Sequence, residues 1–409
     1  MKNSVLLLVA ALPLTTYAHT SFTGSELTPI YADLNQLKKS NVPVLYADEK
    51  TQLGYTVATS EMLNRLSQSA HNDGRCGNFE ALPQPPADLM EVKKDFSSVQ
   101  KLQEKYLNYS RLLKGRISTQ ENPKITEAIS ELNANNIREN VTWLSSYPTR
   151  YNRGTAANQH VTDFANKLKT LIGSPAFPVT VDLISHNKTP QKSIRVSIRG
   201  SERPDEIVVL GGHLDSINGW GFGNAKAPGA DDNASGSSSL YEALRVLLSK
   251  GQPQRTVEFF WYAGEESGLL GSAEIAESYK NDKKNVIAVL QLDMTMFPGS
   301  GTNKIGSMTD FTSPWLRDYL SSINTSYIHA EILDDQCGYG CSDHASWFRR
   351  GYPTVMPSEA TFNSMFQGLH TERDVISPDM SFDHALIFSK IALVMAMDLG
   401  NSTQREPSM

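Results

Sequence analysis

Short apolar runs alternate with longer amphipathic stretches from about residue 190 to residue 293. Such runs predict strands, and apolar positions that recur every three or four residues predict helices. The expected elements are strands 194–198 and 206–210, helix 237–250, strand 256–262, helix 268–279 and strand 286–293, with a last helix over 383–399. Positions 207–210 and 286–290 are almost all apolar, which predicts burial on both faces. The pattern therefore favours an α/β domain with a central, largely parallel mixed sheet covered by helices on both faces.

The chain before residue 118 has a different pattern. Residues 19 to about 80 are polar and weakly patterned, 83–89 is rich in proline, and apolar positions recur at helical spacing over 89–113. Helical patterns return at 125–144 and 161–172. We expect a small, mainly helical segment over 19–117, the α/β domain over 118–400 and a tail over 401–409.

The first 18 residues have the layout of a secretory signal peptide. Lys2 gives a positive start, 5–14 is apolar, and Ala18 is a small residue after which cleavage is expected. A membrane anchor is the alternative, but the run is much shorter than the roughly 20 residues that span a bilayer. We therefore expect a secreted protein without a membrane partner, in a compartment where disulfides persist.

Composition excludes some classes of protein. The 409 residues carry 38 Lys+Arg and 44 Asp+Glu, a net charge of −6, and 39% of them are hydrophobic. Disorder along the whole chain is excluded by this apolar content. A mildly acidic chain lacks the basic character of a nucleic-acid binder. The three cysteines, Cys76, Cys337 and Cys341, are too few for a disulfide scaffold.

Histidine and acidic residues follow the ends of the predicted strands, where open α/β sheets form their sites. Singly, each has an ordinary explanation as a helix cap or a solvated acidic pair, but four such placements in one chain favour a metal site. Two imidazoles with three carboxylates suit zinc, and one carboxylate between two ions can hold a metal pair. The candidate ligands are His213, Asp232, Glu266, Asp293 and His370.

Six motifs in this chain resemble those of the secreted bacterial dizinc leucyl aminopeptidases, in the same order and with similar spacing. They are GGHLDS, PGADDNASG, AGEESGLLGS, QLDM, CGYGCSDHASW and LHT. The resemblance covers about residues 123–400. The N-terminal segment lies outside it and is similar to the propeptides that many members carry.

The resemblance implies two zinc ions per chain. His213 and Asp293 would hold one ion, Glu266 and His370 the other, and Asp232 would bridge them. It also implies a cis peptide bond between Asp232 and Asn233. The other implied roles are a general base (Glu265), a residue that supports the reaction intermediate (Tyr339), a residue that orients His213 (Asp215) and a disulfide (Cys337 with Cys341).

The implied reaction is hydrolysis of the first peptide bond of peptides with a free N-terminus. An apolar pocket favours a leucine-like first residue, although methionines are also ordinary core residues. The pocket positions are Met294, Met308, Met356, Phe362, Met365 and Leu369, beside Tyr339, and Ser358 would widen the pocket. His344 is expected to be structural.

The expected partners are peptide substrates and a processing protease for the N-terminal segment, and the chain is expected to be a monomer. Cys76 could ligate zinc in an inactive precursor or be a free or intermolecular thiol. The alternative functions are a dizinc carboxypeptidase or a glutaminyl-cyclase-like enzyme on the same fold. A catalytically inactive binding domain is disfavoured because all five ligand positions and Glu265 are present.

Overall fold

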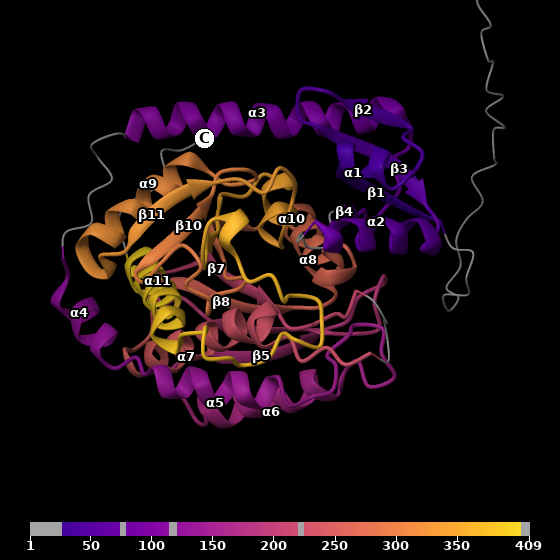
Figure 1. Ribbon diagram of the computed structural model, residues 1–409. Coiled ribbons are helices and arrows are strands. Elements are labelled where there is room, and N and C mark those ends of the chain that lie inside the picture. Colours follow the sequence, from indigo (N-terminus) through magenta and orange to yellow (C-terminus); the bar gives the residue numbers. More distant parts are fainter. Residues whose placement is uncertain (1–26, 74–78, 114–120, 220–224, 402–409) are drawn as a thin grey trace, which may run out of the picture.

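Figure 1 shows the computed structural model of the chain. The structure describes residues 27–73, 79–113, 121–219 and 225–401. The predicted signal peptide, Cys76, the boundary between residues 117 and 118 and the tail beyond Asn401 lie outside these ranges. None of the helices within them combines the length and the apolar composition that crossing a bilayer requires.

The larger part of the chain is built on a six-stranded sheet with the order β12-β9-β7-β8-β6-β5. The first four strands in this order run parallel, and β6 and β5 join antiparallel. The sheet is thus largely parallel and mixed, as predicted. Its strands are β5 (Val179–Ile184), β6 (Ser193–Ile198), β7 (Arg203–His213), β8 (Arg255–Tyr262), β9 (Asn285–Gln291) and β12 (Thr354–Val355).

Helices cover both faces of this sheet. Val208 and Leu210 of β7 belong to a core with α5, α6, α7 and α11, whereas Ile207 and Val209 face α8 and α10. This alternation explains why β7 reads as a continuous apolar run. The helices are α4 (Pro123–Ser130), α5 (Ala134–Leu144), α6 (Gln159–Ile172), α7 (Gly236–Ser249), α8 (Leu270–Asn281), α9 (Pro314–Ile323), α10 (His344–Arg349) and α11 (Phe382–Asn401).

Two details differ from the sequence pattern. The helical stretch 125–144 is divided in two, because Asn133 caps α5 by accepting the Asn135 N–H. A second, three-stranded sheet with the order β11-β10-β13 lies beside the main one. It consists of β10 (Lys304–Met308), β11 (Glu331–Asp335) and β13 (Pro357–Ser358).

Residues 27–73 and 79–113 form an N-terminal unit. Helices make up most of it, as expected, but it also holds a four-stranded antiparallel sheet, order β2-β3-β1-β4, that the sequence pattern did not predict. Its strands are short and bury polar residues such as Thr56 and Glu80, which hides their pattern. The elements are β1 (Thr28–Asp33), α1 (Leu34–Lys39), β2 (Tyr46–Asp48), β3 (Leu53–Ala58), α2 (Ser60–Asn72), β4 (Phe79–Ala81) and α3 (Leu89–Leu113).

The N-terminal unit packs against the larger part of the chain at two places. The long helix α3 lies over α9 and α10 (Figure 1), and the Tyr106 hydroxyl donates to the Gly351 carbonyl at 2.6 Å. The strand β4 lies beside the turn before α8, where the Ala81 N–H donates to the Gly268 carbonyl at 2.9 Å.

A buried ion-pair cluster joins the two contacts. Glu80 of β4 binds both Arg349 and Arg350 at the end of α10, the latter at 2.6 Å. The Glu80 side chain is 1% exposed and each arginine side chain 7%. Arg350 also pairs with Glu277 of α8 at 3.1 Å.

Candidate metal centre

The main sheet places the candidate ligands at one edge. His213 is the last residue of β7, Glu266 lies in the turn Glu265–Ser267 after β8, and Asp293 follows β9 by two residues. Asp232 comes from the turn Ala230–Ser235 that precedes α7, and His370 from the long segment between β13 and α11. The predicted gathering of these side chains at the carboxyl ends of parallel strands is thus what the structure shows.

The five side chains form two groups of three that share Asp232. One group is His213, Asp232 and Asp293, and the other is Asp232, Glu266 and His370. His213 Nε2 lies 3.1 Å from Asp232 Oδ1 and 3.3 Å from Asp293 Oδ1. His370 Nε2 lies 2.8 Å from Asp232 Oδ2 and 2.9 Å from Glu266 Oε2. The two oxygens of Asp232 therefore point to different groups.

Burial of these groups fits bound cations. Each of the five residues is at most 3% exposed. Within the described residues, the carboxylate oxygens of Asp232 and Glu266 accept no ordinary hydrogen bond, and imidazole nitrogens are their close neighbours. Buried carboxylates without donors are costly. Nitrogen and oxygen donors in groups of three are a donor set that zinc accepts.

The pKa values reflect the competition between burial and neighbouring charges. Burial raises the pKa of Glu266 to about 7, and the nearby Asp232 charge acts in the same direction. Burial would also raise the pKa of Asp232, but the imidazoles of His213 and His370 beside its oxygens lower it instead. A divalent cation between these groups would favour the ionised carboxylates and the neutral imidazoles.

Glu265 lies next to the ligands but belongs to neither group. Its side chain is buried, and this burial raises the pKa of the carboxyl well above its usual range. Its backbone N–H donates to Asp215 Oδ1 at 3.1 Å. The same carboxylate lies 3.5 Å from His213 Nδ1, and the Asp215 carbonyl oxygen is 3.2 Å from that nitrogen. Asp215 therefore contacts both the His213 ring and the Glu265 backbone.

The turn that carries Asp232 contains the cis peptide bond Asp232–Asn233, as the resemblance implied. The Asn233 side chain accepts the N–H groups of Gly236 and Met294 and donates to the Leu292 carbonyl. Gly229 precedes the turn with φ 54°, and a Cβ atom there would overlap the Asp232 carbonyl oxygen. Only glycine fits at this position.

The residues that support this turn include two that sequence reasoning missed. Arg150 is fully buried, and its guanidinium donates to four backbone carbonyls, those of Leu144, Leu214, Pro228 and Gly229. Asp374 accepts the N–H groups of Asp231 and Asp232 at 2.8 and 3.0 Å. Asp374 closes the LHTERD segment and could have been suspected from that position, whereas nothing in the sequence marks Arg150.

Most of the predicted pocket residues lie together. Met308, Met356 and Tyr339 form one buried cluster with the disulfide Cys337–Cys341, and Phe362 and Met365 pack against it. Met294 and Leu369 are also buried but lie outside this cluster. Ser358 is buried, and its hydroxyl donates to the Ala360 carbonyl. His344 is buried and belongs to neither metal group.

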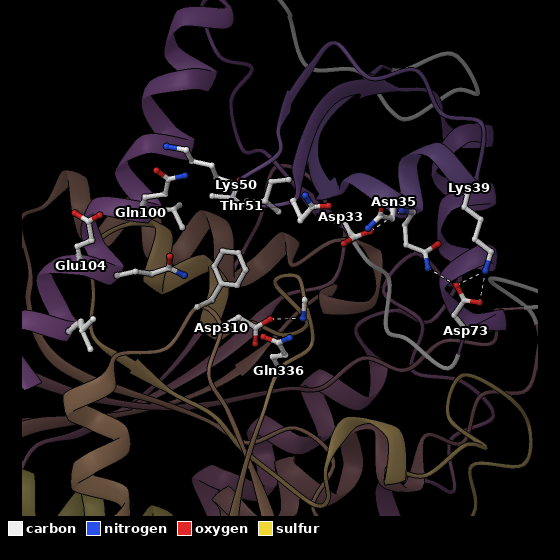
Figure 2. A pocket seen from close by; sticks show the side chains of 18 residues that line it. Asp33, Asn35, Lys39, Lys50, Thr51, Asp73, Gln100, Glu104, Asp310 and Gln336 are labelled. Carbon is white, nitrogen blue, oxygen red and sulfur yellow. Dashed lines mark hydrogen bonds and ion pairs between the residues drawn. The ribbon is translucent and has the colours of Figure 1, made fainter.

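Asp310 holds the loop that carries Tyr339. Its carboxylate accepts the Cys337 N–H at 3.2 Å and the Gly338 N–H at 2.6 Å. Asp310 also lines a cavity of about 990 Å³ between the N-terminal unit and this loop. In Figure 2, Asp33 and Asn35 of the N-terminal unit lie on one side of the cavity, and Asp310 and Gln336 on the other. None of the predicted ligands lines this cavity.

Comparison with known proteins identifies relatives of the chain. The model of peptidase family M28 matches residues 193–405. The leucine aminopeptidase 1 of Trichophyton equinum is 37% identical over 288 residues, which cover 67% of this chain and 76% of that protein. A probable aminopeptidase of Saccharomyces cerevisiae is 34% identical over 287 residues, with coverage of 68% and 76%.

Solved structures extend the likeness to the N-terminal unit. The LapA aminopeptidase of Legionella pneumophila has a TM-score of 0.76 at 25% identity, covering 93% of this chain and all of that chain. LapB of the same organism has a TM-score of 0.73 at 23% identity, with coverage of 92% and 100%.

These sequence relatives are fungal, so the bacterial branch named in the resemblance stays a prediction. The expected class, a zinc-dependent metallo-aminopeptidase and hence a hydrolase, is confirmed. Because the family model matches just over half of the chain, and relatives above 30% identity match two thirds of it, the chain belongs to peptidase family M28.

Proposed function

We propose that this chain is a secreted aminopeptidase that uses two zinc ions to remove apolar, leucine-like residues from the N-termini of peptides. The observation that carries the proposal is the position of Asp232, whose two oxygens face two separate buried groups. One carboxylate shared in this way is the arrangement of two-metal peptidases. His213 and Asp293 would hold one ion, and Glu266 and His370 the other.

The side chains around the two groups suit hydrolysis. Bound zinc would polarise the substrate carbonyl and make water more acidic. Glu265 takes the proton of the attacking water and returns it to the leaving amine, because its carboxyl lies next to the ligands without belonging to either group. Asp215 fixes the His213 ring. The Tyr339 hydroxyl is assigned to the oxyanion that forms on the substrate.

The apolar cluster near the disulfide supports the preference for a leucine-like first residue. Met308, Met356, Phe362 and Met365 would surround such a side chain, and its burial would stabilise the complex. Met294 and Leu369 are proposed to complete the pocket. A panel of amino-acid amides tests the assignment, since preference for a Lys or Glu amide over the Leu amide would contradict it.

We propose that the N-terminal unit is a prosegment that a processing protease removes. We also propose that the chain is a monomer. Two contacts support the prosegment proposal. The Ala81 N–H donates to the Gly268 carbonyl next to the Glu265–Ser267 turn, and Glu80 forms ion pairs with the two arginines at the end of α10. The assignment of residues 1–18 as a signal peptide and both roles of Cys76 stay predictions.

Metal analysis and one assay test the function together. The full chain should bind two zinc ions, and it should release leucine from a chromogenic amide faster after residues up to 117 are removed. A chelator should abolish the activity, and zinc should restore it. One zinc per chain would instead favour a glutaminyl-cyclase-like enzyme, and release of C-terminal residues would favour a carboxypeptidase.

Two variants separate chemistry from folding. Glu265→Gln should keep both zinc ions but lower kcat by about 10²–10⁴-fold, because the general base is lost. Glu202→Gln, the same change at an exposed position, is the matched control and should leave kcat unchanged. Wild-type activity in Glu265→Gln would show that the base is wrongly assigned.

A further inference from the structure

Two acidic side chains behind the metal groups are not used in the mechanism. Asp231 precedes Asp232 in the chain, and Glu359 follows β13. Both are 0% exposed, so their carboxyl groups need hydrogen-bond donors from the protein itself.

Three oxygen atoms of these two side chains accept backbone N–H groups. Asp231 Oδ1 accepts the Met296 N–H at 3.1 Å. Glu359 Oε2 accepts the Phe297 N–H at 2.7 Å, and Glu359 Oε1 accepts the Phe366 N–H at 3.0 Å.

These bonds connect the backbone segments of three candidate ligands. Asp231 is adjacent to Asp232, Met296 and Phe297 follow Asp293 by three and four residues, and Phe366 precedes His370 by four. The Glu359 backbone adds two contacts, since its N–H donates to the Met294 carbonyl at 3.2 Å and its carbonyl lies 2.8 Å from His384 Nε2 of α11.

We propose that Asp231 and Glu359 form a positioning pair that sets the spacing of Asp232, Asp293 and His370 and thereby the affinity for the second zinc ion. The inference rests on the proposed function, because it uses the ligands assigned there. Neither residue touches the substrate or the reacting atoms, and the pair acts through the loops that it joins. Groups that orient metal ligands in this way typically change metal affinity 10–100-fold when they are replaced.

The bonding pattern makes the two acids unequal. In Asp231→Asn, the amide oxygen still accepts the Met296 N–H, so this bond survives. In Glu359→Gln, both oxygens of the original side chain face backbone N–H groups. The new NH₂ must therefore face one of these donors, and one bond is lost. Each variant replaces one buried carboxylate by an amide of the same shape, so the two differ in the backbone bonds that they keep.

Zinc titration against a competing chelator on the full-length chain tests the pair. Asp231→Asn should bind two zinc ions as wild type does, whereas Glu359→Gln should bind the second ion about 10–100-fold more weakly. Asp231→Ala removes the acceptor of the Met296 N–H and should weaken binding of the second ion in the same way. Asp398→Asn is the control, a carboxyl on α11 that accepts the Tyr319 hydroxyl away from the ligands.

The outcomes separate this inference from the proposed function. If wild type fails to bind two zinc ions, the proposed metal centre is wrong. If wild type binds two and Glu359→Gln matches Asp231→Asn, only the positioning pair is wrong. Should Glu359→Gln fail to fold, Asp231→Ala against Asp231→Asn decides, and equal zinc affinities in those two variants would overturn the inference.

Discussion

Replacing Glu80 by alanine should loosen the N-terminal unit from the rest of the molecule. The change removes a carboxylate that is 1% exposed and leaves Arg349 without its acidic partner. Arg350 keeps the ion pair with Glu277 on α8, whose side chain is 35% exposed, and a hydrogen bond to the Ser346 carbonyl. Breaking a buried ion pair at one end costs about 3–5 kcal/mol, since the remaining charge stays buried and uncompensated.

This cost predicts a measurable change in thermal unfolding. At about 2 °C for each kcal/mol in a chain of this size, Tm should fall by about 6–10 °C. Limited proteolysis should also cut the N-terminal unit of Glu80→Ala faster than that of wild type, because its docked state is less populated.

A surface ion pair of the same unit supplies the control. Glu49 lies 3.9 Å from Lys38, and the two side chains are 74% and 57% exposed. Glu49→Ala should therefore cost less than about 1 kcal/mol and leave the proteolysis rate unchanged. If Glu80→Ala unfolds at the same temperature as Glu49→Ala, the buried cluster does not hold the unit and the reasoning is refuted.

Three further predictions follow from the site and its surroundings. Tyr339→Phe should lower kcat by about 10²–10³-fold with little change in KM, as measured on a leucine amide, because it removes a donor to the oxyanion. Asp310→Ala should also lower kcat, because the Cys337 and Gly338 N–H groups lose their acceptor and the loop with Tyr339 shifts. An unchanged kcat in a variant with an intact disulfide would contradict this prediction. Burial lowers the pKa of His160 to about 3. Below pH 6.5 this histidine binds a proton in the unfolded chain but stays neutral in the folded chain. The free energy of unfolding should therefore fall as the pH is lowered from 6.5 to 3. In His160→Gln, the free energy of unfolding measured with urea should fall less steeply over that pH range. An unchanged slope against pH would exclude His160 as a cause of the pH dependence.

The strands of the larger part and the gathering of the candidate ligands could be predicted because one physical cause produces both signals. A parallel strand between helix layers must be apolar on both faces, as β7 and β9 are, so it stands out in the sequence. The polar residue that ends such a strand, His213 for example, is then conspicuous. The motif PGADDNASG marks the turn with Asp232.

The features that escaped prediction depend on contacts between distant segments. Arg150 reaches carbonyls from residues 144 to 229, and Glu359 joins segments near Met296 and Phe366. No local pattern marks such residues, since their partners come together only in the folded chain. The N-terminal sheet was missed for a related reason, because short strands such as β4 (Phe79–Ala81) give too few positions for a periodic signal.

Arg150 has a consequence for how metal ions enter the site. Its guanidinium joins the end of α5, the segment after β7 and the glycine turn before Asp232, with contacts that require no metal. The loops are thus already ordered when a cation arrives, and binding costs little conformational entropy. Recovery of zinc by the metal-free chain should then proceed without the slow step of refolding a segment.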